Sequence, residues 1–266
     1  MSTQAGHLGQ QGQPSSLEKP ISPQLLGEVR DFWFSHLESE DAAILPGFNE
    51  MKCWFMGGEE LDTLCRQPVL EAIKSSNATP EAIISDASPS DPGDWLALVL
   101  LLDQFPRNCY RGPSASLVFL IFDPLAQAVA RKAIDLGIPI SRDIRYHLSR
   151  RMWFYLPLMH SEDLTLHDHA VAEYERMGRD FKTLMTSSPV NDAAEERCRQ
   201  VQATDKEATE KILASNLDFE IKHREIIVRF GRYPHRNGPL GREMTADEQK
   251  YLDEGGETFS ASASKS

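Results

Sequence analysis

The chain has 266 residues, of which 41% are hydrophobic, and its 40 acidic and 28 basic side chains give a formal net charge of −12. This length suits one large domain or two small ones, and the apolar fraction can supply a core without disulfides or metals. The acid excess argues against a protein that coats nucleic acid by bulk attraction, so we expect no DNA partner.

Cysteine usage and terminal composition indicate the cellular compartment. The four cysteines are Cys53, Cys65, Cys109 and Cys198. They are scattered without a CxxC pair, which is typical of reduced thiols in the cytosol. The N-terminus lacks the charged and apolar segments of a signal peptide, and no apolar run approaches the roughly 20 residues that span a bilayer. We therefore expect a cytoplasmic protein that does not enter a membrane.

Both ends of the chain are predicted to be disordered tails. Residues 1–20 are rich in Gln, Gly, Ser and Pro, and residues 257–266 are dominated by Ser and Ala. Neither segment can bury enough apolar surface to offset the entropy of ordering. We predict one domain over residues 21–256, and we expect removal of residues 1–20 to leave the thermal stability unchanged.

Helix start signals recur along the predicted domain. The expected capping positions are Ser22, Thr79, Asp123 and Thr245. A proline suited to the first helical position follows each of the first three. Thr245 is instead followed by Glu248, the spacing of a capping box. Gly137 predicts a helix end, because glycine readily adopts the left-handed conformation beyond the last turn.

Apolar spacing predicts helices and no hairpin. The run 95–105 is too long for a strand and has few β-branched residues, so we predict a buried helix capped by Asp94. Residues 125–136 and 143–156 show helical spacing, and residues 162–185 and 192–229 indicate two more helices joined by a turn at 186–191. The sequence therefore predicts an all-α fold, a single domain of stacked antiparallel helix pairs.

Three polar clusters, residues 103–111, 160–169 and 229–242, contain the chemically most capable side chains. A large side chain followed by proline lies within or just before each cluster, at Pro106, Pro157 and Pro234, and proline disfavours helix at the residue before it. We therefore predict that the polar side chains lie on loops that meet at one pocket. The residues expected to line it are Asp103, Arg107, His160, Glu162, Arg232, His235 and Arg236. The alternative is that they cap helix carbonyls.

Long motifs in these clusters resemble a known family, domain of unknown function 924. They are residues 101–108 (LLDQFPRN), 157–163 (PLMHSED) and 229–237 (RFGRYPHRN), with an aromatic signature at 31–34 (DFWF). The resemblance covers about residues 25–255 and implies an all-helical fold similar to tetratricopeptide repeats. Cys109, Tyr110 and the loop 186–191 depart from the family pattern and carry no functional weight.

The resemblance also implies an activity, because a fungal branch of this family makes arginine-containing cyclic dipeptides from aminoacyl-tRNA. The amine of one aminoacyl ester attacks the carbonyl of another, which requires a general base, an oxyanion donor and cations near the tRNA phosphates. His160 and His235 are the candidate bases, and Glu162 could orient one of them. The predicted substrate-binding residues are Asp103, Arg107, Asn108, Arg111, Arg229, Arg232, Arg236, Asn237 and Arg242. Among these, Asp103 is best placed to recognise a substrate guanidinium.

Other interpretations stay open. Asp103 could pair with Arg107 on one helix, and Asn108 and Asn237 could satisfy loop backbone groups. The whole chain could be a non-enzymatic helical-repeat binding module of unknown ligand. A third possibility is a metal-assisted hydrolase that uses the acidic and histidine side chains of 160–169, but their spacing matches no zinc signature. We expect neither a metal nor another cofactor.

Overall fold

The computed structural model describes residues 21–56, 58–188 and 192–259, and within these residues the regular elements are helices, without a strand. The all-α prediction is confirmed. The predicted tail 1–20, most of the predicted tail 257–266 and half of the predicted turn 186–191 lie outside the described residues.

The chain forms short helices first and long helices last. The first group is α1 (Pro23–Phe34), α2 (Glu40–Ile44), α3 (Phe48–Phe55), α4 (Glu59–Leu64), α5 (Pro68–Ser75) and α6 (Pro80–Ala87). The central group is α7 (Pro92–Cys109), η1 (Gly112–Ser114), α8 (Ala115–Leu117), η2 (Val118–Phe122), α9 (Asp123–Asp135), η3 (Ile138–Ile140), α10 (Leu148–Arg151), η4 (Met152–Phe154) and α11 (Leu156–Met159). The last group is α12 (Leu164–Thr186), α13 (Ala193–Thr204), α14 (Lys206–Phe230), η5 (Pro234–Arg236) and α15 (Ala246–Asp253).

Three of the five predicted helix caps are confirmed. The side chain of Ser22 accepts from a backbone amide of α1, and Thr79 does the same for α6. Thr245 and Glu248 form the full capping box of α15, in which each side chain accepts from the other residue's backbone amide. Asp123 is different, because the chain is already helical before it and its side chain binds arginines instead.

Helix α7 forms the centre of the apolar core, with residues 96–102 almost completely buried. Asp91, rather than Asp94, caps this helix, by accepting from the Asp94 amide at 2.9 Å. The helix also continues through Pro106 to Cys109, so the predicted end at Phe105 is wrong. A proline here removes one hydrogen bond near the last turn, and the helix still closes with the Tyr110 amide, which donates to the Pro106 carbonyl at 2.8 Å.

Two other predicted helices are interrupted. Residues 143–156 contain a turn and then α10, η4 and the start of α11, so Pro157 lies in the first turn of a helix. The predicted helix 192–229 is split at Asp205, which has φ −136° and ψ 76° and caps α14 through the Ala208 amide. A local capping side chain can break an apolar pattern that looks continuous.

Residues Gly112–Asp135 form one continuous helical stretch that is long and apolar enough to cross a membrane by length and composition, with a mean hydropathy of 1.4. The sequence prediction missed it because Asp123-Pro124 suggested a helix start. Core helices of soluble proteins can have the same length and composition, and 39% of the apolar window is buried here. The stretch is compatible with a soluble protein, and the cytoplasmic location stays a prediction.

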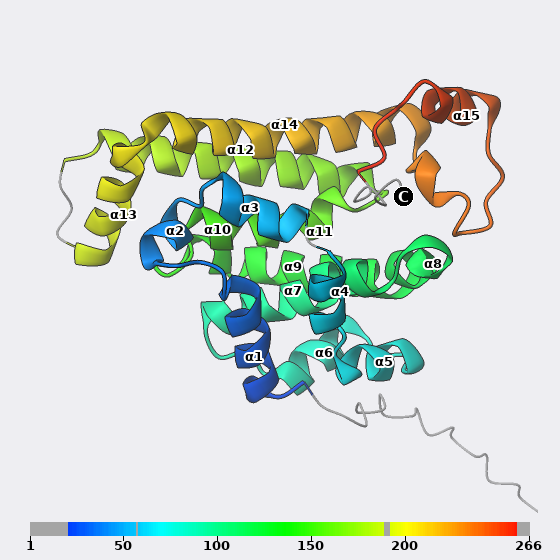
Figure 1. Ribbon diagram of the computed structural model, residues 1–266, viewed down its shortest axis with the longest axis horizontal. Coiled ribbons are helices and arrows are strands. Elements are labelled where there is room, and N and C mark those ends of the chain that lie inside the picture. Colours follow the sequence, from blue (N-terminus) through cyan, green and yellow to red (C-terminus); the bar gives the residue numbers. More distant parts are fainter. Residues whose placement is uncertain (1–20, 57, 189–191, 260–266) are drawn as a thin grey trace, which may run out of the picture.

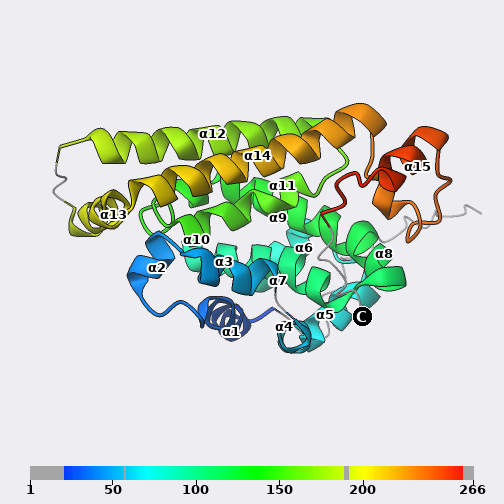
Figure 2. The same ribbon diagram turned by 45° about the horizontal axis from the view of Figure 1, so that its top comes forward.

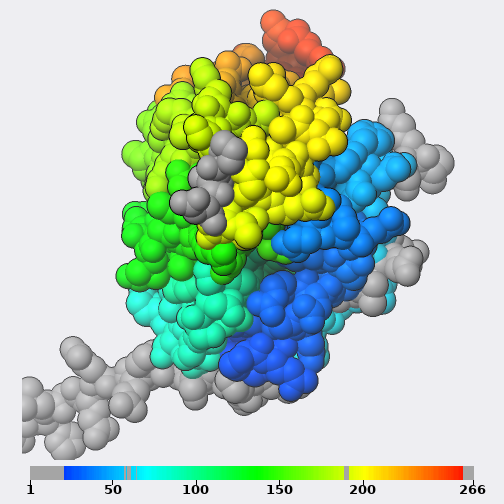
Figure 3. All heavy atoms as spheres, turned by 90° about the vertical axis from the view of Figure 1, so that its left-hand side faces the viewer, coloured from blue at the N-terminus to red at the C-terminus, as the bar shows by residue number. Residues whose placement is uncertain are grey.

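The long helices α12 and α14 pack side by side in opposite directions above the layer that contains α7, α9 and α11 (Figures 1 and 2). At one end of the molecule α13 lies directly against α2 (Figure 3), where Arg197 pairs with Asp41. At the other end, the chain after α14 turns back toward the central layer before it forms α15. This returning segment brings residues 231–242 to the start of α9 and to the residues that follow α11.

Candidate functional site

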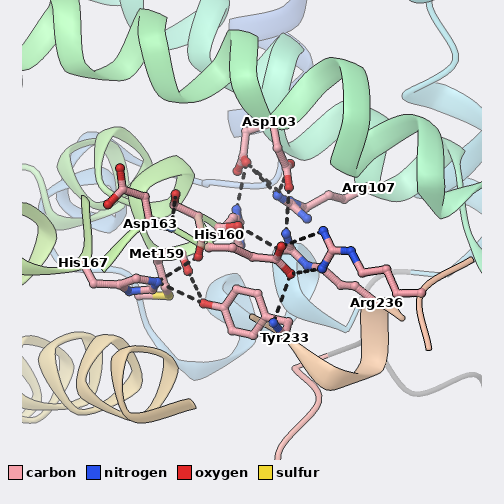
Figure 4. Close-up of polar contacts among 12 residues, drawn as sticks. Asp103, Arg107, Met159, His160, Asp163, His167, Tyr233 and Arg236 are labelled. Carbon is pink, nitrogen blue, oxygen red and sulfur yellow. Dashed lines mark hydrogen bonds and ion pairs between the residues drawn. The ribbon is translucent and has the colours of Figure 1, made fainter. Parts of the chain in front are cut away.

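The site is built around Asp103, a residue of α7 whose side chain is 1% exposed. Its Oδ1 lies 2.8 Å from His160 Nδ1 and accepts from Arg107 Nε and Nη2, each at 3.3 Å (Figure 4). Its Oδ2 accepts from Gln104. Burial alone would raise the pKa of Asp103, but the adjoining His160 and Arg107 outweigh it and lower that pKa.

A second buried carboxylate, Asp123, connects two of the three polar clusters. Arg107 Nη2 donates to it at 2.5 Å and Arg236 Nη1 at 3.3 Å. Arg236 also donates to the backbone carbonyl of His160 at 2.9 Å. The Arg236 guanidinium lies over the rings of Phe119 and Tyr233, at 4.4 and 4.5 Å from their centroids, which fixes its plane.

Glu162 joins the second cluster to the third. Its two oxygens accept from Arg242 at 3.0 and 2.8 Å, a bidentate ion pair. It also accepts from the Tyr233 backbone amide, and the Tyr233 hydroxyl donates to the Met159 carbonyl at 2.6 Å. Both ends of Tyr233 are therefore tied to the segment that carries His160.

His160 is poised as a base. Burial and the Arg107 charge lower its pKa, against the influence of Asp103, so the imidazole is neutral at neutral pH. With Nδ1–H donating to Asp103, the lone pair is on Nε2. Nε2 has no hydrogen-bond partner among the residues that the structure describes, and the side chain is 16% exposed. The Arg107 side chain is 22% exposed, and its Nη1 likewise bonds to none of the described residues.

Most of the predicted pocket residues do lie together. Asp103, Arg107, His160 and Arg236 form one hydrogen-bonded network, and Glu162 adjoins it through Tyr233. The prediction that each helix ends before its proline is wrong in two cases, since Pro106 lies within α7 and Pro157 within α11. In the third, α14 ends earlier, at the left-handed Gly231 with φ 69°.

Most of the other predicted side chains have partners outside this network. Arg232 pairs with Glu248, Arg229 with Asp247 and Arg111 with Asp62. Asn108 donates to the Gln104 carbonyl and Asn237 to Met244 Sδ. His235 Nδ1 is buried without a hydrogen bond to the described residues, and burial lowers the pKa of this imidazole to about 4.

Sequence reasoning missed Asp123, Tyr233 and Glu220, and it considered His167 only as a possible metal ligand. Asp123 looked like a helix cap, and only the packing of α9 against α7 reveals it as a partner of two arginines. His167 and Glu220 are completely buried between α12 and α14, 2.7 Å apart. A useful signal was the presence of a histidine and a glutamate on the apolar faces of two amphipathic helices. Among the described residues, no group of three His, Cys, Asp or Glu side chains is arranged to hold a metal.

The comparisons with known proteins give a family and a related structure. The family model described as "Bacterial protein of unknown function (DUF924)" matches residues 29–256. A solved structure of a protein of unknown function from Agrobacterium tumefaciens is 27% identical, with a TM-score of 0.54, and the match covers 87% of this chain and 98% of that one. No curated protein matches the chain. Because the family model spans the whole described site, the chain belongs to the DUF924 family.

Proposed function

We propose that this protein is an acyl-transfer enzyme in which His160 is the general base and Arg107 stabilises the oxyanion. The observation that carries the proposal is that one atom, Asp103 Oδ1, binds both side chains. It orients the His160 ring so that Nε2 is left to accept a proton, and it orients Arg107 so that Nη1 is left to donate. Both nitrogens belong to side chains that are partly exposed, at 16% for His160 and 22% for Arg107, so a substrate can reach them.

The proposed chemistry needs only these groups. His160 Nε2 removes a proton from an amine or hydroxyl nucleophile. At the same time, the lone pair of the nucleophile attacks the carbonyl carbon of an ester. The carbonyl oxygen becomes an oxyanion that accepts from Arg107 Nη1. When the intermediate collapses, the ester C–O bond breaks and the His160 imidazolium returns the proton to the leaving alkoxide. Asp103 stabilises the imidazolium in between, in the manner of a catalytic triad carboxylate.

Within this class, the finer proposal is synthesis of an arginine-containing cyclic dipeptide from aminoacyl-tRNA. The support is the resemblance to a family whose fungal branch makes such dipeptides, and the nucleophile would then be an α-amine. Two expected roles change in this proposal. Because Asp103 contacts His160 and Arg107, we assign it to orienting the base and not to binding a substrate guanidinium. Arg111, Arg229, Arg232 and Arg242 each pair with a carboxylate, which weakens the expectation that they hold tRNA phosphates.

The test is expression of the full chain in a bacterial host, with extracts examined by mass spectrometry for new cyclic dipeptides. In parallel, the purified protein is incubated with arginine ethyl ester, and acid release is followed. His160→Gln removes the base and keeps the volume, and we expect it to lower the rate by about 100-fold or more. His235→Gln, a matched change at a buried histidine outside the network, should retain the rate. Equal loss in both variants would refute the assignment of His160.

The two assays separate the two levels of the proposal. Ester turnover without cyclic dipeptides would refute the finer reaction and keep the acyl-transfer class. No turnover with any amino-acid ester, in a protein with a normal helical spectrum, would refute the class. The binding-module alternative would then gain, and the open groove of about 540 Å³ between α2 and α13, lined by Leu45, Val201 and the Asp41–Arg197 pair, is where a ligand should be sought.

A further inference from the structure

The completely buried pair of His167 and Glu220 lies behind the proposed base. His167 belongs to α12 and Glu220 to α14, and the two side chains are 0% exposed. His167 Nε2 is 2.9 Å from the carbonyl oxygen of Ser161, the residue between His160 and Glu162. The pair therefore contacts the same short segment that carries the base.

Hydrogen-bond chemistry fixes the protonation of this pair. A carbonyl oxygen only accepts, so His167 Nε2 must carry a hydrogen. His167 Nδ1 and Glu220 Oε1 are 2.7 Å apart, and a neutral imidazole with Nε2–H has a lone pair at Nδ1. A carboxylate oxygen at that distance would place two acceptors against each other. One proton must therefore lie between them, and the pair has no net charge.

The surroundings favour this proton on the glutamate. Glu220 Oε2 is buried and has no hydrogen-bond partner among the described residues, which is costly for a carboxylate and less so for a carboxylic acid. Burial also raises the pKa of Glu220, although His167 and Arg224 oppose this. The other titratable groups that face the pair are Tyr233, His223, Tyr174 and Asp163.

We propose that His167 and Glu220 are positioning residues for His160. The protonated carboxyl of Glu220 donates a hydrogen bond to His167 Nδ1, and His167 Nε2–H donates a hydrogen bond to the Ser161 carbonyl. Arg236 donates to the preceding carbonyl in the chain, that of His160, at 2.9 Å. Two consecutive carbonyls are thus fixed by donors from α12 and from the returning C-terminal segment. This double anchor sets the direction in which the His160 ring leaves the backbone, and with it the contact to Asp103.

The catalytic part of this inference rests on the proposed function, so the test uses a spectroscopic measurement that needs no substrate. The full chain, labelled with ¹⁵N-histidine, gives the protonation and tautomer of each ring, with signals assigned from single His→Gln variants. We expect His167 to be neutral at neutral pH, with its hydrogen on Nε2. A doubly protonated His167 at neutral pH would overturn the proton assignment.

Variants of Glu220 test the positioning role. Glu220→Gln keeps a donor to His167 Nδ1, so the His160 signals should match those of the natural protein. Glu220→Ala removes the donor, and we expect the His160 Nδ1–H signal to broaden and ester turnover to fall by about tenfold. Glu40→Ala is the matched control, because it removes the carboxylate 2.9 Å from His147 at another site. It should leave His160 unchanged.

The outcomes distinguish this inference from the proposed function. Unchanged His160 signals in a folded Glu220→Ala protein would overturn the positioning role, whatever the activity. If that variant does not fold, an altered His160 spectrum in Glu220→Gln would overturn it instead. Altered His160 signals in Glu220→Ala, without ester turnover in any form of the protein, would support the positioning role and refute only the acyl-transfer proposal.

Discussion

At the residue scale, the arrangement of charges is more informative than their number. Arg107 and Arg236 share Asp123, and Arg107 also binds Asp103. Three of these four side chains are less than a tenth exposed, so each charge depends on its partners for stabilisation. Sequence patterns identified Asp103, Arg107, His160 and Arg236 as one group, but not Asp123, because nothing local distinguishes a cap from a buried ion-pair residue.

Removing the Asp123 carboxylate should therefore destabilise the folded protein. We expect Asp123→Ala to lower the free energy of unfolding by about 3–5 kcal/mol, since it leaves two arginines without their shared carboxylate. The measurement is urea denaturation at neutral pH. Asp247→Ala breaks an exposed ion pair with Arg229 at 2.9 Å and should cost less than about 1 kcal/mol. Similar losses in the two variants would contradict the structural role assigned to Asp123.

The pH dependence of ester turnover tests the state of His160. Burial and the Arg107 charge lower the pKa of this imidazole, so its neutral, active form persists below the usual midpoint of about 6.5. We expect kcat/KM to be constant from neutral pH down past that midpoint and then to fall as one proton binds. The stability that the neutral imidazole contributes is lost in the same direction, as pH falls through the lowered pKa. A decline in kcat/KM centred above pH 6.5 would show that the Asp103 carboxylate raises the pKa of His160 by more than burial and Arg107 lower it.

At the scale of elements, capping residues and glycine predicted where helices begin and end. Apolar spacing was a poorer guide to whether a helix continues. Ser22, Thr79 and Thr245 cap helices as expected, and Gly137 has φ 73° just beyond α9. These features depend on a few neighbouring residues. The path of α7 through Pro106 and the break at Asp205 depend on packing and on a competing cap, so apolar spacing alone could not reveal them.

Gly231 offers a clean test of one such element end. It ends α14 with φ 69°, and a Cβ there would meet no atom within 4 Å. Gly178 lies inside α12 with equally open space. We expect Gly231→Ala to destabilise the protein by about 1–2 kcal/mol, because the left-handed conformation strains alanine. Gly178→Ala should stabilise it by about 0.5–1 kcal/mol. Urea denaturation gives both values, and equal signs would refute the conformational argument.

At the scale of the whole molecule, the apolar core is divided unequally. One large cluster runs from Ile21 to Cys198 through α7, and a small separate one consists of Ile226, Ile227 and Tyr233 with Phe230, Tyr251 and Phe259 against it. The segment 231–259 therefore has little apolar contact with the main core. Its attachment is mainly polar, through Arg236, Tyr233 and the Arg242–Glu162 pair.

This division predicts that the C-terminal segment opens before the rest of the protein. Native-state hydrogen exchange should show α15 amides exchanging through local opening, whereas α7 amides exchange only through global unfolding. Arg242→Ala removes a bidentate ion pair, so it should accelerate amide exchange in α15 and leave exchange in α7 unchanged. The control is Lys250→Ala, at a side chain that is 69% exposed, and it should change the exchange rate in neither helix. Because this segment supplies Arg236 to the site, faster opening should also lower ester turnover. Equal protection of α15 and α7 would instead mean that the polar contacts join both clusters into one cooperative unit.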